Sequence, residues 1–130
     1  MPDLSPRRVR PWEALHAWQH AHKLFLAIHR AAAKWPAQER YALGAQIRRS
    51  AFSVPANIAE GHAKKGPGEF RKSLDVSLGS LAEVQYTLHA AHDLGIIDVE
   101  EWRALDLLSD EAGRCLWGLY RSGPKGRAGG

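Results

Sequence analysis

A chain of 130 residues that is 45% hydrophobic and 25% charged fits one globular domain, and no stretch approaches the roughly 20 consecutive apolar residues of a membrane span. The net charge of +4 is unevenly placed: eleven Lys and Arg against four Asp and Glu give residues 1–66 a balance of +7, whereas four against ten give residues 67–118 a balance of −6. The lone cysteine, Cys115, excludes an internal disulfide and favours a reducing, cytoplasmic compartment.

Residues 1–11 are rich in proline and arginine and have no periodicity. No apolar segment follows the arginines, so we predict a flexible basic arm and not a signal peptide. From Pro11 to Trp35, apolar side chains recur at spacings near three and four, and Pro36 follows them. This pattern predicts one helix of about six turns.

The second predicted helix ends at Gly61 and contains a proline, Pro55. Its apolar stripe consists of Tyr41, Leu43, Ile47, Ala51, Val54 and Ile58. A proline inside a helix removes one backbone hydrogen bond and costs on the order of 3 kcal/mol. Either the helix is kinked there or a new helix begins with Ser53 as its cap, and the unbroken phase of the stripe favours the kink. Ser53 and Asn57 are then expected to bond the backbone groups that the bend frees.

After a loop at residues 62–68, a third helix is predicted from Pro67 to Leu94. Its middle, Ser77-Leu78-Gly79-Ser80, is small for a helix interior, although a glycine costs about 1 kcal/mol there. We therefore expect the segment around Pro55 to approach it closely there.

The third helix is predicted to end in a Schellman closure at Gly95 and Ile96. Asp98, followed by Glu101, predicts a capped start for a fourth helix. Since no segment shows strand alternation, the sequence predicts an all-α, antiparallel up-down-up-down four-helix bundle. The bundle takes residues 12–121, between the arm at residues 1–11 and a disordered basic tail at residues 122–130.

Neither a metal site nor a catalytic motif is predicted. His16 and His20 share a helical face, as do His89 and His92, but no carboxylate or cysteine has the spacing of a third ligand. The Glu-x-x-His signature of carboxylate-bridged metal bundles, phosphate-binding loops and nucleophile motifs are missing from the sequence. We expect no cofactor and no enzymatic activity, and a metal-dependent enzyme using these histidines is the weakest hypothesis.

Six basic residues are candidates for binding nucleic acid or a partner protein: Arg48, Arg49, Lys64, Lys65, Arg71 and Lys72. Arg48 and Arg49 project about 100° apart on a helix, so one is expected to bridge to a carboxylate of the acidic half and the other to face solvent, a subunit or phosphate. Glu60 and Glu83 are expected to bind these arginines or backbone groups. Nothing aromatic interleaves with the six residues, which favours backbone-directed, salt-dependent binding over base stacking.

The oppositely charged halves allow several interpretations. They can pair within the fold or between subunits, and the excess basic face either stays solvated or binds a polyanion.

The segment Gln46–Gly61, with Trp35-Pro36, Glu39–Leu43, Leu78–Glu83 and Ala90–Gly95, resembles the four-helix-bundle proteins encoded in intervening sequences of bacterial 23S ribosomal RNA genes. The resemblance spans about residues 12–121, and its structural motif consists of Ser53, Pro55, Asn57, Glu60, Gly61, Gly79, Ser80 and Glu83. It implies a bundle that assembles into a homopentameric ring without established enzymatic activity.

The accessory protein of diversity-generating retroelements is a more distant relative, and it binds reverse transcriptase and nucleic acid through a basic surface. Relatives are usually rich in arginine after the position of Gly61, whereas this chain has lysines, which lack the forked donors of arginine. Two hypotheses follow. The first is a non-enzymatic homo-oligomeric scaffold or adaptor for RNA, DNA or a reverse-transcriptase-like partner. The second is a purely structural oligomer without a nucleic-acid ligand.

Overall fold

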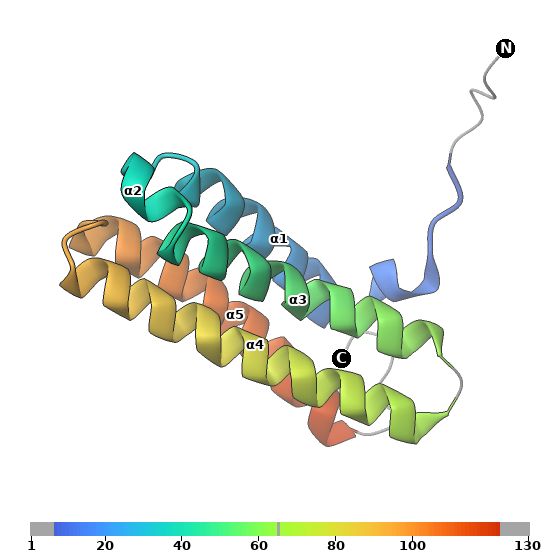
Figure 1. Cartoon of the computed structure of the whole chain (residues 1–130). Coiled ribbons are helices and arrows are strands. Elements are labelled where there is room, and N and C mark those ends of the chain that lie inside the picture. Colours follow the sequence, from blue (N-terminus) through green and yellow to red (C-terminus); the bar gives the residue numbers. More distant parts are fainter. Residues whose placement is uncertain (1–6, 65, 123–130) are drawn as a thin grey trace, which may run out of the picture.

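The computed structural model describes residues 7–64 and 66–122, and within them every regular element is a helix. In chain order these are η1 Pro11–Ala14, α1 His16–Ala32, α2 Ala37–Arg40, α3 Leu43–Ala63, α4 Pro67–Asp93 and α5 Val99–Ser122 (Figure 1). The long helices pack in the order α1, α3, α4, α5, and α5 closes the bundle against α1. Figure 1 shows that successive long helices run in opposite directions. The predicted all-α four-helix bundle is confirmed.

The core takes its apolar side chains from all four long helices. Leu24, Ile58, Leu88 and Leu116, one from each helix, are all at most 1% exposed. Tyr41, which the stripe of the second predicted helix included, is instead 81% exposed because the chain turns there between α2 and α3. None of the helices in residues 7–64 and 66–122 combines the length and the hydropathy needed to cross a bilayer.

The first predicted helix is divided at Leu15 into the 3-10 helix η1 and α1. Leu15 has an extended backbone (ψ 126°) and places its side chain in the core, 2% exposed. Polar bonds stabilise the short helix before it: the Glu13 carboxylate accepts the Arg10 N–H at 2.6 Å, and the Gln19 amide donates to the Glu13 carbonyl at 2.8 Å. The continuous helix that the periodicity predicts therefore does not form at Leu15, because the extended backbone there places the side chain in the core.

Helix α3 runs unbroken through Pro55, so the alternative of a second helix capped by Ser53 is wrong. The Asn57 amide donates to the Ser53 carbonyl at 2.9 Å and to the Ser53 Oγ at 3.0 Å. From α4, Ser77 Oγ donates to the Val54 carbonyl at 2.9 Å and Ser80 Oγ donates to Ser53 Oγ at 2.8 Å. Asn57 thus bonds a backbone carbonyl as predicted, whereas the bonds given for the Ser53 hydroxyl are to side chains. The bend itself stays a prediction.

The glycine that lets α3 and α4 approach each other closely is Gly61 and not Gly79. A Cβ built on Gly61 would lie 2.4 Å from the Cβ of Ser73, whereas one on Gly79 would meet no atom within 4 Å. Because Ser73 and Ser77 are four residues apart, they share the face of α4 that packs on α3, and Gly79 points to the outside. The segment around Pro55 does approach the small middle of α4 as predicted, through Ser77 and Ser80. Gly79 itself has no packing role there, and that part of the prediction is wrong.

The two predicted signals between α4 and α5 are confirmed. The Ile96 N–H donates to the Ala91 carbonyl at 2.8 Å, and Gly95 has φ +75°, which is the Schellman geometry. The Asp98 Oδ1 accepts the Glu101 N–H at 2.8 Å and caps α5.

Candidate nucleic-acid interface

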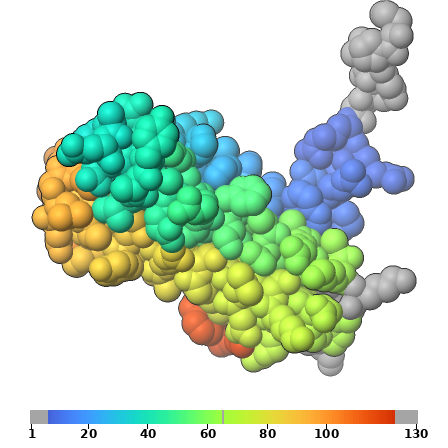
Figure 2. All heavy atoms as spheres, viewed as in Figure 1, coloured from blue at the N-terminus to red at the C-terminus, as the bar shows by residue number. Residues whose placement is uncertain are grey.

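The uneven charge of the sequence places the positive charge on one pair of helices and the negative charge on the other pair. Helices α1 and α3 lie side by side and belong to residues 7–64, which carry ten Lys and Arg against three Asp and Glu, a balance of +7. Helices α4 and α5 belong to residues 66–122, which carry five against ten, a balance of −5. We call these two halves the basic layer and the acidic layer; in Figure 2 they are coloured blue to green and yellow-green to red.

The two layers hardly neutralise each other. Among the described residues, one ion pair joins them, between His20 Nδ1 and Glu111 Oε2 at 4.0 Å. The remaining pairs stay within a layer: Arg7–Glu13, Lys64–Glu60, His89–Asp93 and His92–Asp93. No Lys or Arg of the basic layer within residues 7–64 thus pairs with a carboxylate of the acidic layer in residues 66–122.

The predicted arginine pair has two different environments at the start of α3. Arg48 is partly buried and its Nη2 donates to the Arg40 carbonyl at 2.9 Å, so it holds the end of α2. Arg49 is exposed and donates to the Gln46 Oε1 at 2.8 Å, and the Gln46 amide in turn donates to the Glu83 carboxylate. The prediction of a direct bridge from either arginine to the acidic half is therefore wrong, because Gln46 stands between Arg49 and Glu83.

The other predicted basic residues lie at the opposite end of α3. Lys64 Nζ binds the Glu60 carboxylate at 3.0 Å, and this hydrogen bond raises the pKa of Lys64. Glu60 therefore binds Lys64 and not the predicted arginines. The Arg71 guanidinium covers the Tyr120 ring at 4.1 Å.

The length of α3 separates the predicted basic residues into two groups, one at each end of the helix. The exposed Lys72 is next to Arg71, and Lys65 is outside the described residues. From Arg49 to Ala63 a helix that rises 1.5 Å per residue covers about 21 Å. The predicted basic residues thus do not form one strip.

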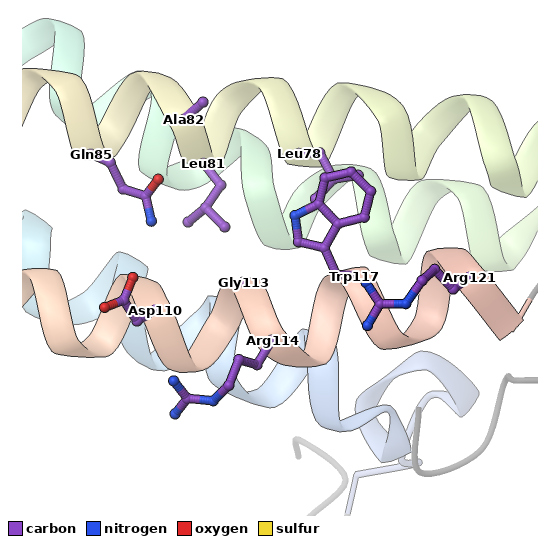
Figure 3. A pocket seen from close by; sticks show the side chains of 9 residues that line it. All are labelled: Leu78, Leu81, Ala82, Gln85, Asp110, Gly113, Arg114, Trp117 and Arg121. Carbon is purple, nitrogen blue, oxygen red and sulfur yellow. The ribbon is translucent and has the colours of Figure 1, made fainter.

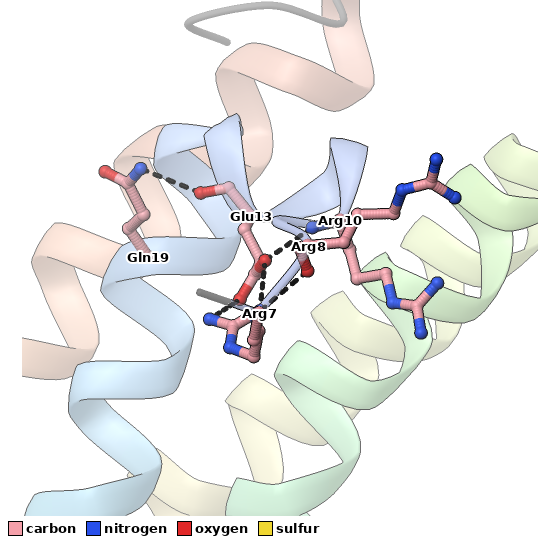
Figure 4. A network of polar contacts seen from close by, with 5 residues as sticks. All are labelled: Arg7, Arg8, Arg10, Glu13 and Gln19. Atoms are coloured by element: carbon pink, nitrogen blue, oxygen red, sulfur yellow. Dashed lines mark hydrogen bonds and ion pairs between the residues drawn. The ribbon is translucent and has the colours of Figure 1, made fainter. Parts of the chain in front are cut away.

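Arginines that precede η1 add positive charge to the basic layer at the end where Lys64 lies. This follows because η1 contacts both α1 and α3. The Arg7 guanidinium binds both Glu13 oxygens, at 2.9 and 3.1 Å, and this bond, with the Arg10 N–H, lowers the pKa of Glu13. Arg8 and Arg10 are exposed, and Figure 4 shows their guanidinium groups directed away from Glu13. The predicted arm is therefore anchored at Arg7, and residues 1–6 lie outside the described residues.

Beside Arg48 and Arg49 is a row of rings that sequence reasoning missed. Ring centroids lie 4.9 Å apart for Trp12 and Trp18, 4.8 Å for Trp18 and His22, 5.7 Å for Phe25 and His29, and 5.6 Å for Phe25 and Phe52. Trp18, His22, Phe25 and His29 recur every three or four residues on α1, and this spacing was the available signal.

These rings line two adjoining cavities between α1 and α3, which we call the aromatic groove. One cavity of about 600 Å³ is lined by Phe25, His29, Ala45, Arg48, Arg49 and Phe52. The other, of about 230 Å³, shares Phe25 and Phe52 with it and continues to Trp18 and Trp12. The expectation that nothing aromatic accompanies the arginines is wrong, because the fold brings the rings of α1 to them.

A separate cavity of about 470 Å³ lies between α4 and α5. Figure 3 shows Trp117 extending from α5 towards Leu78 of α4, with Arg114 and Arg121 on the same helix as Trp117. Trp117 is 47% exposed, so this cavity presents an apolar ring to the surface of the acidic layer.

The paired histidines pack against other groups. His89 and His92 both contact the Trp102 ring, with centroids 5.2 and 4.3 Å apart, and both lie beside Asp93. Within the part of the chain that the structure describes, no three His, Cys, Asp or Glu side chains are grouped so that they could hold a metal ion.

Asp106→Asn is expected to stabilise the protein at neutral pH. Partial burial, and then the charge of Asp110, raise the pKa of Asp106 above its ordinary 3.8. The folded state then binds this proton more tightly than the unfolded state, so the group lowers stability as the pH rises through its raised pKa. Thermal melts should show the advantage of Asp106→Asn near about pH 7 and its loss towards about pH 3. Asp75→Asn, an exposed carboxylate of α4, is the control, and an equal gain there would contradict the assignment.

Comparison with known proteins agrees with the architecture. The family model described as "23S rRNA-intervening sequence protein" matches residues 13–118. A solved structure of a protein with unknown function from the S23 ribosomal protein family of Bacteroides thetaiotaomicron VPI-5482 is 20% identical, with a TM-score of 0.73. The match covers 81% of this chain and 98% of that chain, and at this identity it shows the fold alone. No match was found among curated proteins. Because the family model spans most of the bundle, the chain belongs to the 23S rRNA-intervening sequence protein family.

Proposed function

We propose that this chain is a non-enzymatic helical-bundle scaffold that self-associates and binds RNA or DNA through the phosphates. The observation that carries the proposal is the charge polarity of the bundle. The basic layer has a balance of +7, and none of its Lys or Arg side chains in residues 7–64 is ion-paired with the acidic layer. An uncompensated basic surface of this kind attracts nucleic-acid backbones independently of sequence.

Self-association is supported by the apolar surface of the other layer. Six of the nine large hydrophobic side chains that are exposed in the described residues belong to the acidic layer: Val76, Tyr86, Leu94, Val99, Leu107 and Trp117. Large apolar side chains that stay exposed although the core is filled are candidates for protein–protein contacts. Heterologous contacts of this layer would close a ring, and the family resemblance favours five subunits. A reverse-transcriptase-like protein is the partner class that the same resemblance suggests.

Electrophoretic mobility shift with a structured RNA hairpin tests the nucleic-acid part. The variant Arg10→Gln with Arg49→Gln is expected to weaken binding and to reduce the slope of log K against log salt by about 2, since each of the two arginines would neutralise one phosphate. Arg103→Gln, which removes an exposed charge from α5, should leave the slope unchanged. A parent protein that does not shift the hairpin at low salt would refute this part, and light scattering that gives a monomer would refute the assembly.

A purely structural role is the second candidate, because several polar side chains of α3 are used within the fold. Arg48 binds the Arg40 carbonyl and Gln46 binds Glu83. This hypothesis expects Arg48→Ala to lower thermal stability while the parent protein binds no nucleic acid.

A further inference from the structure

We infer that the aromatic groove binds a single-stranded nucleic acid, whose bases stack on Phe52 and Phe25 while Arg49 and Arg48 contact the phosphates. This inference rests on the proposed nucleic-acid binding and specifies which form of nucleic acid the basic layer takes. The groove lies between α1 and α3, and its larger cavity has a volume of about 600 Å³.

The rings of the groove are arranged for stacking. Phe52 is 57% exposed and meets Phe25 in an edge-to-face arrangement, at an interplanar angle of 72°, so a large part of the Phe52 ring is open to solvent. Trp18 and His22 continue the row as a parallel pair, 4.8 Å apart with an interplanar angle of 9°. Aromatic rings in a row bind successive bases of a single strand without strong sequence preference.

The charges of the groove fit a phosphate backbone. Arg48 and Arg49 line the larger cavity, and none of the residues that line either cavity is Asp or Glu. Arg48 uses one nitrogen for the Arg40 carbonyl and Arg49 uses one for Gln46, so each guanidinium keeps further donors for phosphate oxygens. A polyanion is attracted here, and so would be the acidic layer of a second copy, which the mass measured by light scattering distinguishes.

Single strands are favoured over duplexes because stacking on a side chain requires an unpaired base. In a duplex the base faces are already covered by their neighbours, and only phosphates and groove edges are accessible. The positions from Arg48 to Ala59 on α3 cover about 16 Å of helix, which suits a few stacked nucleotides at about 3.4 Å each. RNA and DNA share the phosphates and base faces that the groove would contact.

Fluorescence anisotropy of the full chain with three labelled probes tests the inference: a decamer of uridine, a decamer of thymidine and an RNA hairpin. Phe52→Leu keeps an apolar side chain and removes the ring. It should weaken binding of both decamers about tenfold and leave binding of the hairpin unchanged. Tyr41→Leu removes a ring that is 81% exposed in the basic layer and outside the aromatic groove, and it should change neither affinity.

The outcomes separate this inference from the proposed function. Decamer affinity that is equal for the parent, Phe52→Leu and Tyr41→Leu overturns the inference. Hairpin binding that is retained in the same experiment leaves the proposed function standing. A parent protein that binds none of the three probes refutes both. If Phe52→Leu lowers the mass measured by light scattering without changing decamer affinity, the groove is a contact between subunits and the inference is overturned. A loss of decamer binding by Phe52→Leu alone, at unchanged mass, supports it.

Discussion

Replacing Gly61 by alanine is expected to lower the free energy of unfolding by about 2 kcal/mol. The new Cβ would lie 2.4 Å from the Cβ of Ser73 and 3.1 Å from the Phe70 ring, so α3 and α4 would have to separate. Overpacking of this kind costs about 1–3 kcal/mol, and here the rigid Cβ of Ser73 places the cost near the upper end. The better helix propensity of alanine returns about 1 kcal/mol. Chemical denaturation at a fixed protomer concentration measures the difference.

Two companion variants make this prediction specific. Gly79→Ala is the same substitution on α4 where no atom lies within 4 Å, and it should raise stability by about 0.5–1 kcal/mol. Ser73→Gly should be more favourable in the Gly61→Ala protein than in the parent, since it removes the atoms that clash. Equal effects of Gly61→Ala and Gly79→Ala would show that the two helices do not meet at Gly61.

Leu116→Ala is expected to lower the free energy of unfolding by about 3 kcal/mol, the largest effect of any single truncation proposed for this chain. Leu116 is 1% exposed and belongs to the hydrophobic core, where α5 packs against α1 and α4. Its truncation removes buried methyl groups and leaves a cavity that rigid neighbouring helices cannot fill.

The matched control lies on the same helix. Leu107 is 56% exposed, so Leu107→Ala should cost less than about 1 kcal/mol in the free energy of unfolding. Denaturant titration of both variants, followed by circular dichroism, gives the comparison. Similar losses for the two leucines would contradict the orientation of α5 in the bundle.

Local signals in the sequence were the most reliable guides to the fold. The Gly95–Ile96 closure and the Asp98 cap form as predicted because each depends on backbone groups only a few residues away. Continuous helices across Leu15 and across Tyr41 were predicted wrongly. At Leu15, burial of the side chain decides the backbone, and at Tyr41 the chain turns before α3 begins.

The candidate site was predicted only in part. Arg48 and Arg49 do line a cavity, but Lys64 and Arg71 lie at the other end of α3 and are engaged with Glu60 and Tyr120. Phe25 and His29 were missed because they come from α1, which the sequence separates from the arginines by a turn and a short helix. Phe52 was overlooked although it follows Arg49 by three residues on α3, a spacing that brings side chains together on a helix.

The sequence by itself determined that this chain forms four amphipathic helices, where α4 ends and α5 begins, and the family to which it belongs. Apolar periodicity reports which residues share a face of one helix, and that was enough for the bundle. It does not report which face of a second helix lies opposite. Only the tertiary structure therefore decided that α4 meets α3 at Ser73 and Gly61, and that Phe25 lies beside Phe52 and the arginines. It also decided that, in the described residues, the one ion pair between the basic and acidic layers involves a histidine and no Lys or Arg.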